Sequence, residues 1–156
     1  MFGRGSEEVD ALQAAGIAYE VVPGLSTFTA VPALTGIPLT ARGVAAQLTI
    51  VTGTSGDGSA LDYAHLAATP GTLVIFMGSK RLGAVAAGLV SAGRPADEPA
   101  AVVARLSLPD AEVRTGTLST IEQVAEGLPT PSLIVIGDVV AKARSLGAAL
   151  ELAATA

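Results

Sequence analysis

Two loops of this sequence place small polar residues directly after a predicted strand. Ser26 and Thr27 follow Pro23-Gly24, where their hydroxyls could bind a polar ligand. The loop from Thr52 to Gly58 is rich in Gly, Ser and Thr, and it is not a P-loop because no Lys follows its glycines. Ligands of open α/β sheets collect at the carboxyl ends of strands, so both loops predict a small-molecule site. A plain N-cap at Ser26 and an ordinary surface loop remain the structural alternatives.

Three other features carry weaker chemical signals. Met77-Gly78 ends the apolar run TLVIFM, where a glycine permits close approach and a thioether offers a polarizable surface. Arg4 lies in a Gly-rich turn before a helix start, a place where backbone N–H groups can hold an anion. His65 has no obvious partner in the sequence, and we interpret it as structural rather than catalytic.

Composition excludes several classes of function. The chain has no Cys and one His, which rules out a thiol nucleophile, a disulfide framework and a Cys/His zinc site. Its Asp residues show no metal-ligand spacing, so no metal is expected. The formal net charge of −5 is the wrong balance for a general nucleic-acid binder. No apolar run approaches the roughly 18–20 residues of a membrane helix, and the N-terminus lacks the apolar core of a signal peptide. These observations favour a cytoplasmic protein that binds neither nucleic acid nor membrane.

Aliphatic runs alternate with helical patterns along the chain, which predicts an α/β fold with a largely buried sheet. Ser119-Thr120-Ile121-Glu122 reads as a capping box at a helix start. The expected strands are Ile17–Val22, Gln47–Thr52, Thr72–Met77, Ala100–Ala104, Glu112–Thr117 and Ser132–Ile136. The other expected helices start at Ser6, at Ser26, at Leu61 and at Ser79, and a terminal helix spans Val139–Leu152.

The motifs FGRG, VPG-x-S-T, GIPLT-x-RG, Met77-Gly78 and AGRPAD follow one another along the chain. Together they resemble the tetrapyrrole methylase family, and in particular its members that methylate uroporphyrinogen III. Each piece is weak alone, but the order and spacing hold over nearly the whole chain. The matching segments are Phe2–Gly43 with FGRG, VPG-x-S-T and GIPLT-x-RG, Thr49–Gly53, Gly71–Gly78, Ala92–Val103 with AGRPAD, Thr115–Ile121 and Pro131–Val140.

The resemblance implies two α/β domains with a cofactor, S-adenosyl-L-methionine, in the cleft between them. Residues 1–43 would be the C-terminal remainder of the first domain, and residues 44–156 would be the second. The implied reaction is C-methylation of uroporphyrinogen III to precorrin-2, in sirohaem and cobalamin biosynthesis. The implied partners are an anionic tetrapyrrole substrate and a second copy of the chain in a homodimer.

The resemblance also assigns roles to individual residues. The cofactor-binding positions are Ser26, Thr27, Met77, Leu106 and Gly137. Arg4 and Arg42 are the candidates for binding the carboxylates of the substrate.

Departures from the family pattern put the activity in question. The family has a Gly-Pro-Gly-Asp loop and reads Gly-Gly-Asp-Pro-Phe before FGRG, whereas Met1 stands directly before Phe2 here. We therefore expect an incomplete first domain and assign no catalytic residue. Thr54 occupies a position where the family commonly has His, and Leu106 occupies a position where it commonly has Gly. Because that Gly lies close to the cofactor in the family, a Leu side chain would overpack the site, which typically costs on the order of 1–3 kcal/mol. The open alternatives are an impaired methyltransferase, a methylase of a later corrin precursor, and a non-catalytic remnant.

Overall fold

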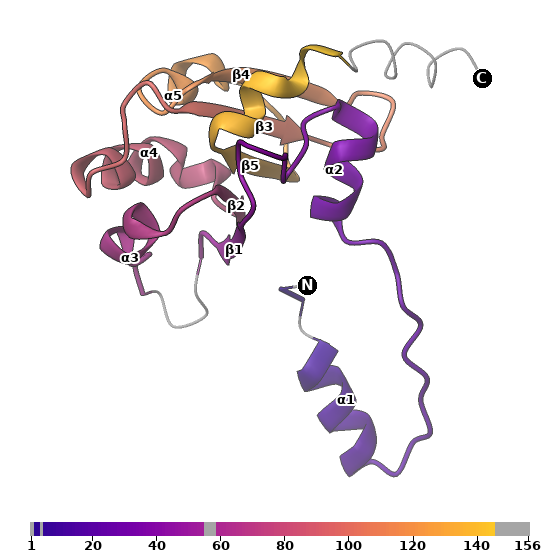
Figure 1. The fold of residues 1–156 in the computed structure, drawn as a ribbon. Coiled ribbons are helices and arrows are strands. Elements are labelled where there is room, and N and C mark those ends of the chain that lie inside the picture. The colour runs from indigo at the N-terminus through magenta and orange to yellow at the C-terminus, as the bar shows by residue number, and fades with distance from the viewer. Residues whose placement is uncertain (1, 4, 55–58, 146–156) are drawn as a thin grey trace.

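The computed structural model describes residues 2–3, 5–54 and 59–145 (Figure 1). Short helices and five of the six predicted strands alternate along the described chain. The elements are α1 (Gly5–Ala14), α2 (Thr27–Thr35), β1 (Leu48–Thr52), α3 (Tyr63–Ala68), β2 (Thr72–Phe76), the 3₁₀ helix η1 (Ser79–Arg81), α4 (Leu82–Ser91), β3 (Pro99–Ala104), β4 (Glu112–Thr117), α5 (Ile121–Val124), β5 (Ser132–Ile136) and the 3₁₀ helix η2 (Asp138–Ser145).

The five strands form one mixed sheet in the order β1-β2-β5-β3-β4. Only β1 and β2 are parallel, and every other neighbouring pair is antiparallel. The inner strands β2, β5 and β3 are aliphatic and almost fully buried, as expected for strands covered on both faces. The expected α/β fold with a buried sheet is confirmed.

Helices cover both faces of this sheet, which gives three layers (Figure 1). On one face α3, α4 and α5 pack around Ile75, Leu89 and Ile134. On the other face α2, the turn that follows it and η2 pack around Val31, Val74 and Val135. The alternation of side chains along each strand divides the apolar residues between the two cores.

Three local predictions were wrong or only partly tested. Residues 17–22 form no strand, because the structure places no neighbouring strand beside them to complete a ladder. The helix at Ile121 is confirmed, but its N-cap is Thr120 and makes no side-chain cap hydrogen bond, so the capping box was wrong. The terminal helix is 3₁₀ over Asp138–Ser145, and its expected remainder lies outside the described residues.

Helix α1 and the segment after it lie away from the sheet (Figure 1). Helix α1 has no buried residue, whereas Val31, Ile37 and Leu39 belong to the same core as the sheet. The division of the chain at residue 43 therefore stays a prediction. No helix in the described part of the chain is long and apolar enough to span a membrane.

A buried ion pair holds the turn before β3. Arg94 Nε lies 2.8 Å from Glu98 Oε2, and Arg94 Nη2 donates to the Gly71 carbonyl at the start of β2. Burial raises the pKa of Glu98 above its ordinary value of 4.5, Arg94 opposes this effect, and Asp138 adds to it. The folded chain thus holds the Glu98 proton to a higher pH than the unfolded chain does.

Glu98→Gln should remove one source of pH dependence from stability. As pH rises from the ordinary pKa of Glu98 through its raised folded value, the wild-type chain loses the stability that proton uptake on folding provides. Urea unfolding should be measured from about pH 4 to about pH 7. The free energy of unfolding of the wild type should fall, relative to that of the variant, as the pH rises across this window. If the free energies of unfolding of the two proteins changed with pH in the same way, the raised pKa of Glu98 in the folded chain would be contradicted.

Candidate functional site

The strand register brings four chain segments to one edge of the sheet. Thr52 at the end of β1 pairs with Phe76 at the end of β2. Because β5 is antiparallel to both its neighbours, its first residues lie beside Phe76 and Ala104. The loops after β1, β2 and β3 and the segment before β5 therefore converge.

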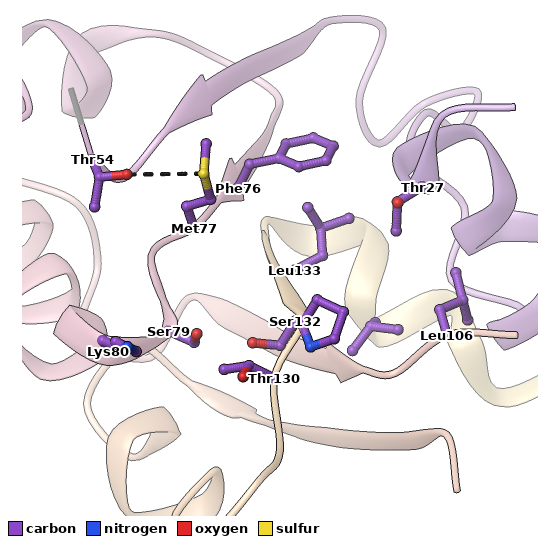
Figure 2. Close-up of a pocket in the computed structure, with 12 residues that line it drawn as sticks. Thr27, Thr54, Phe76, Met77, Ser79, Lys80, Leu106, Thr130, Ser132 and Leu133 are labelled. Carbon is purple, nitrogen blue, oxygen red and sulfur yellow. Dashed lines mark hydrogen bonds between the residues drawn. The ribbon is translucent and has the colours of Figure 1, made fainter. Parts of the chain in front are cut away.

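A cavity of about 540 Å³ lies at this edge (Figure 2). In Figure 2, Thr27 and Leu106 stand at one end, Thr54, Met77 and Lys80 at the other, and Leu133 between them. The lining residues are Thr27, Thr54, Phe76, Met77, Ser79, Lys80, Val103, Leu106, Thr130, Pro131, Ser132 and Leu133.

A close contact between two glycines shapes the Met77 end of the cavity. A Cβ on Gly53 would lie 2.6 Å from Gly78 Cα and 3.2 Å from the Met77 carbonyl oxygen. The Gly53 N–H also donates to the Phe76 carbonyl. Only glycine lets the two loops approach this closely, so Gly53 and Gly78 set where Met77 stands.

Met77 itself has a left-handed backbone, with φ of +54°, and its side chain is 47% exposed. The hydroxyl of Thr54 donates to its sulfur at 4.0 Å. A residue other than glycine at positive φ is strained, and such residues cluster at ligand sites. The thioether is thus held at the mouth of the cavity rather than in the core.

The loop after β3 fixes the opposite end. Arg105 and Ser107 both have positive φ, of 49° and 69°. The Arg105 N–H donates to the Pro131 carbonyl at 2.8 Å, and its Nε pairs with Asp110 at 2.8 Å. These contacts hold Leu106 in the cavity wall, where it also packs against the core around Val31, Val74 and Val135.

The cavity wall combines an apolar floor with hydroxyls and one cation. Among the described lining residues, Lys80 is the charged side chain, and none is a carboxylate or a histidine. His65 is on α3 and does not line the cavity. Within the described residues no cluster of His, Asp and Glu could hold a metal ion. The wall can bind and orient a ligand, but these side chains offer no carboxylate or imidazole base.

The structure brings together three of the predicted site residues, Thr27, Met77 and Leu106. Ser26 precedes Thr27 at the N-cap of α2 and makes no side-chain cap hydrogen bond. Its carbonyl accepts hydrogen bonds from Thr29 and Ala30 instead. Ser26 is therefore next to the cavity without being part of its wall.

The other predicted residues lie elsewhere. Gly137 is at the far end of β5, where a Cβ would lie 3.4 Å from Thr72 Cα, at the opposite edge of the sheet from Met77. Arg42 lines a separate hollow of about 390 Å³ at the C-terminal end of α2, together with Lys142. Arg4 lies outside the described residues.

Sequence reasoning missed the segment before β5, which contributes Thr130, Pro131 and Ser132. The rule that ligands collect at carboxyl ends of strands applies to parallel sheets, and β5 runs the other way. Ser79 and Lys80 were also missed, although their position directly after Met77-Gly78 was a usable signal.

Comparison with known proteins agrees with this architecture. The family model of the tetrapyrrole (corrin/porphyrin) methylases matches residues 1–122. Siroheme synthase 1 of Serratia proteamaculans is 44% identical over 141 residues, which cover 90% of this chain and 30% of that protein.

Two solved structures extend the comparison. One is uroporphyrin-III C-methyl transferase of Thermus thermophilus complexed with S-adenyl homocysteine, with 38% identity and a TM-score of 0.73 over 90% of this chain and 62% of that one. The other, a cobalt precorrin-4 methyltransferase, has a TM-score of 0.80 over 90% of this chain and 60% of that one, and its 22% identity shows a shared fold alone.

The chain thus spans about a third of the curated relative and less than two thirds of the solved ones. Within that span, the family match covers the two loops with Gly53 and Gly78 and the loop after β3, but it ends before the segment that precedes β5. The chain belongs to the tetrapyrrole (corrin/porphyrin) methylases.

Proposed function

We propose that this chain binds S-adenosyl-L-methionine at the edge of its sheet and contributes that site to the C-methylation of uroporphyrinogen III to precorrin-2. The observation that carries the proposal is the convergence of Thr27, Met77 and Leu106 on one cavity. The 38% identity to a methyltransferase solved with S-adenyl homocysteine supports the choice of ligand.

The residues present fit such a ligand. A cavity of about 540 Å³ falls in the range of small-molecule sites, which are mostly apolar with a few placed polar groups. When bound, S-adenosylmethionine supplies a methyl group on a positively charged sulfur. The apolar wall formed by Phe76, Val103 and Leu133 suits a flat ring, and the Thr27 hydroxyl at the N-terminus of α2 suits a polar end.

The contribution of this chain is positioning. In-line transfer to an electron-rich carbon depends chiefly on holding the two reactants in line, which is what a rigid cavity wall does. Met77 lies at the open mouth, where its thioether can contact the ligand. The anionic substrate would lie beyond that mouth, and Lys80 is the cation of the wall that could attract its carboxylates.

Calorimetry with S-adenosylhomocysteine tests the proposal. We expect saturable binding with one site per chain, and no heat at millimolar ligand would overturn it. A methyl-transfer assay with uroporphyrinogen III then separates binding from turnover. Since the described lining residues include no carboxylate or histidine, we expect the isolated chain to bind the ligand and to methylate poorly.

Leu106→Gly should bind S-adenosylhomocysteine about tenfold more tightly, since overpacking by a side chain of this size costs on the order of 1–3 kcal/mol. Leu106 lines the same end of the cavity as Thr27 (Figure 2), so its removal enlarges that end of the cavity. The matched control is Leu108→Gly, in the same loop but 43% exposed and outside the cavity wall. An unchanged or weaker affinity in Leu106→Gly, measured by calorimetry, would show that Leu106 does not obstruct the ligand.

A further inference from the structure

Thr54 is held in a fixed position at the Met77 end of the cavity. The Thr52 hydroxyl donates to the Thr54 carbonyl at 2.9 Å and accepts from the Thr54 N–H at 3.4 Å, so both backbone polar groups of Thr54 are tied to the last residue of β1. The Gly53 N–H donates to the Phe76 carbonyl, which ties the same turn to the end of β2. The direction of the Thr54 side chain is therefore set by the sheet, although the residue itself is exposed.

The Thr54 hydroxyl directs its proton at the sulfur of Met77. The two atoms lie 4.0 Å apart (Figure 2). A threonine hydroxyl has a single proton to donate and lone pairs that accept, and a thioether sulfur can only accept. Because the proton points at the thioether, the lone pairs are what this hydroxyl offers to a ligand. Thr54 and Met77 together therefore present electron-rich atoms at this end of the cavity.

The rest of this end of the wall disfavours a positive charge. Among the described lining residues no carboxylate is present, and Lys80 is the charged side chain. Lys80 stands at the same end as Thr54 and Met77 (Figure 2), where its charge repels a positively charged ligand atom. The Thr54 oxygen and the Met77 sulfur thus oppose the effect of Lys80 on a cation at this end.

A methyl donor in this cavity must present its sulfur where the methyl acceptor can reach it. The acceptor lies outside the cavity, and Met77, which is 47% exposed, stands at the mouth. Carbon groups on a positively charged sulfur are polarised, which strengthens their C–H···O contacts with an oxygen such as that of Thr54. The sulfur of the demethylated product is neutral. Contacts at the mouth therefore differ between the two ligands, whereas contacts with the apolar wall are the same.

We propose that Thr54 is a specificity-determining residue, whose hydroxyl oxygen favours the positively charged sulfur of S-adenosylmethionine over the neutral sulfur of S-adenosylhomocysteine. The inference rests on the proposed function, because it needs this ligand in this cavity. Specificity is a difference between two affinities, so the effect of Thr54 appears in the ratio of the two dissociation constants.

Calorimetry with both ligands measures this ratio, which is the dissociation constant of S-adenosylmethionine divided by that of S-adenosylhomocysteine. Thr54→Val keeps the branched shape of the side chain and removes its oxygen. It should raise the ratio about threefold, which is the size of a weak C–H···O contact. Thr54→Ser keeps the oxygen and should keep the wild-type ratio. Residue 54 is exposed, so urea unfolding of both variants should match that of the wild type.

Two further variants separate a contact with the charged sulfur from a general loss of fit. Thr27→Val removes a hydroxyl at the opposite end of the cavity, so it should weaken the binding of both ligands by the same factor and leave the ratio unchanged. Lys80→Gln removes the charge that repels the positively charged sulfur, and it should lower the ratio about twofold.

Failure to bind and failure to discriminate give different results. If neither ligand binds the wild type, the proposed function fails and this inference fails with it. If both ligands bind and Thr54→Val leaves the ratio unchanged, or Thr27→Val shifts it equally, only this inference is overturned. A ratio that Lys80→Gln raises or leaves unchanged would place the sulfur away from this end of the cavity and would also overturn it.

Discussion

Gly53→Ala is expected to lower the free energy of unfolding by about 2–3 kcal/mol, near the upper end of typical overpacking costs. The added Cβ would stand 2.6 Å from Gly78 Cα and 3.0 Å from Gly78 N, and both contacts are with backbone. Backbone cannot rotate away as a flexible side chain does, so the loops after β1 and β2 must separate. Urea unfolding of the two proteins measures the change.

The same substitution should weaken S-adenosylhomocysteine binding at least tenfold, which corresponds to about 1.4 kcal/mol. Separation of the loops moves Thr54 and Met77, which both line the cavity. Gly24→Ala is the matched control, because a Cβ at residue 24 meets nothing within 4 Å. If Gly53→Ala bound the ligand as the wild type does, the glycine contact would not position this end of the site.

Met77→Gly should make the chain more stable and a poorer binder. Relief of the left-handed conformation at φ of +54° is worth about 1–2 kcal/mol, less the greater chain entropy of glycine, for a net gain of about 0.5–1 kcal/mol. The loss of the thioether contact should reduce S-adenosylhomocysteine affinity about tenfold, since a partly buried side chain of this size contributes about 1.5 kcal/mol. Thermal unfolding and calorimetry on the same preparation measure both effects.

Ser107→Gly is the control for this prediction. Ser107 has φ of +69° in an exposed loop and does not line the cavity, so glycine there should stabilise the chain without changing affinity. An unchanged affinity in Met77→Gly would show that the strained methionine serves the packing of the loop rather than the ligand.

The accuracy of the sequence predictions depended on how local their physical cause was. Strands such as Thr72–Phe76 and Ser132–Ile136 were predicted well, because aliphatic β-branched runs favour a buried strand wherever they pair. The Ile17–Val22 segment has similar propensity but no ladder partner, and its strand was the main error. Propensity does not supply the neighbour that a strand needs.

Some residues of the candidate site were predicted from the sequence, and others were identified only by the structure. Thr27 and Met77 were proposed from their positions at the ends of predicted strands and then from the resemblance, whereas Leu106 was proposed from the resemblance alone. The structure brings all three to one cavity. Gly137 was assigned to the same site, but β5 is antiparallel and carries it to the opposite edge. The segment before β5 lines the cavity instead, and no local pattern in residues 130–132 indicated that these residues would lie there.

The sequence by itself determined the α/β class, the family and the absence of thiol chemistry, since these follow from residue types and short motifs. Only the tertiary structure decided which ends of the strands share an edge, that the loops at Gly53 and Gly78 are in contact, and that residues 17–22 have no neighbouring strand among the described residues. The physical reason is that strand order, direction and register depend on contacts between residues far apart in the chain, which periodicity and composition do not specify.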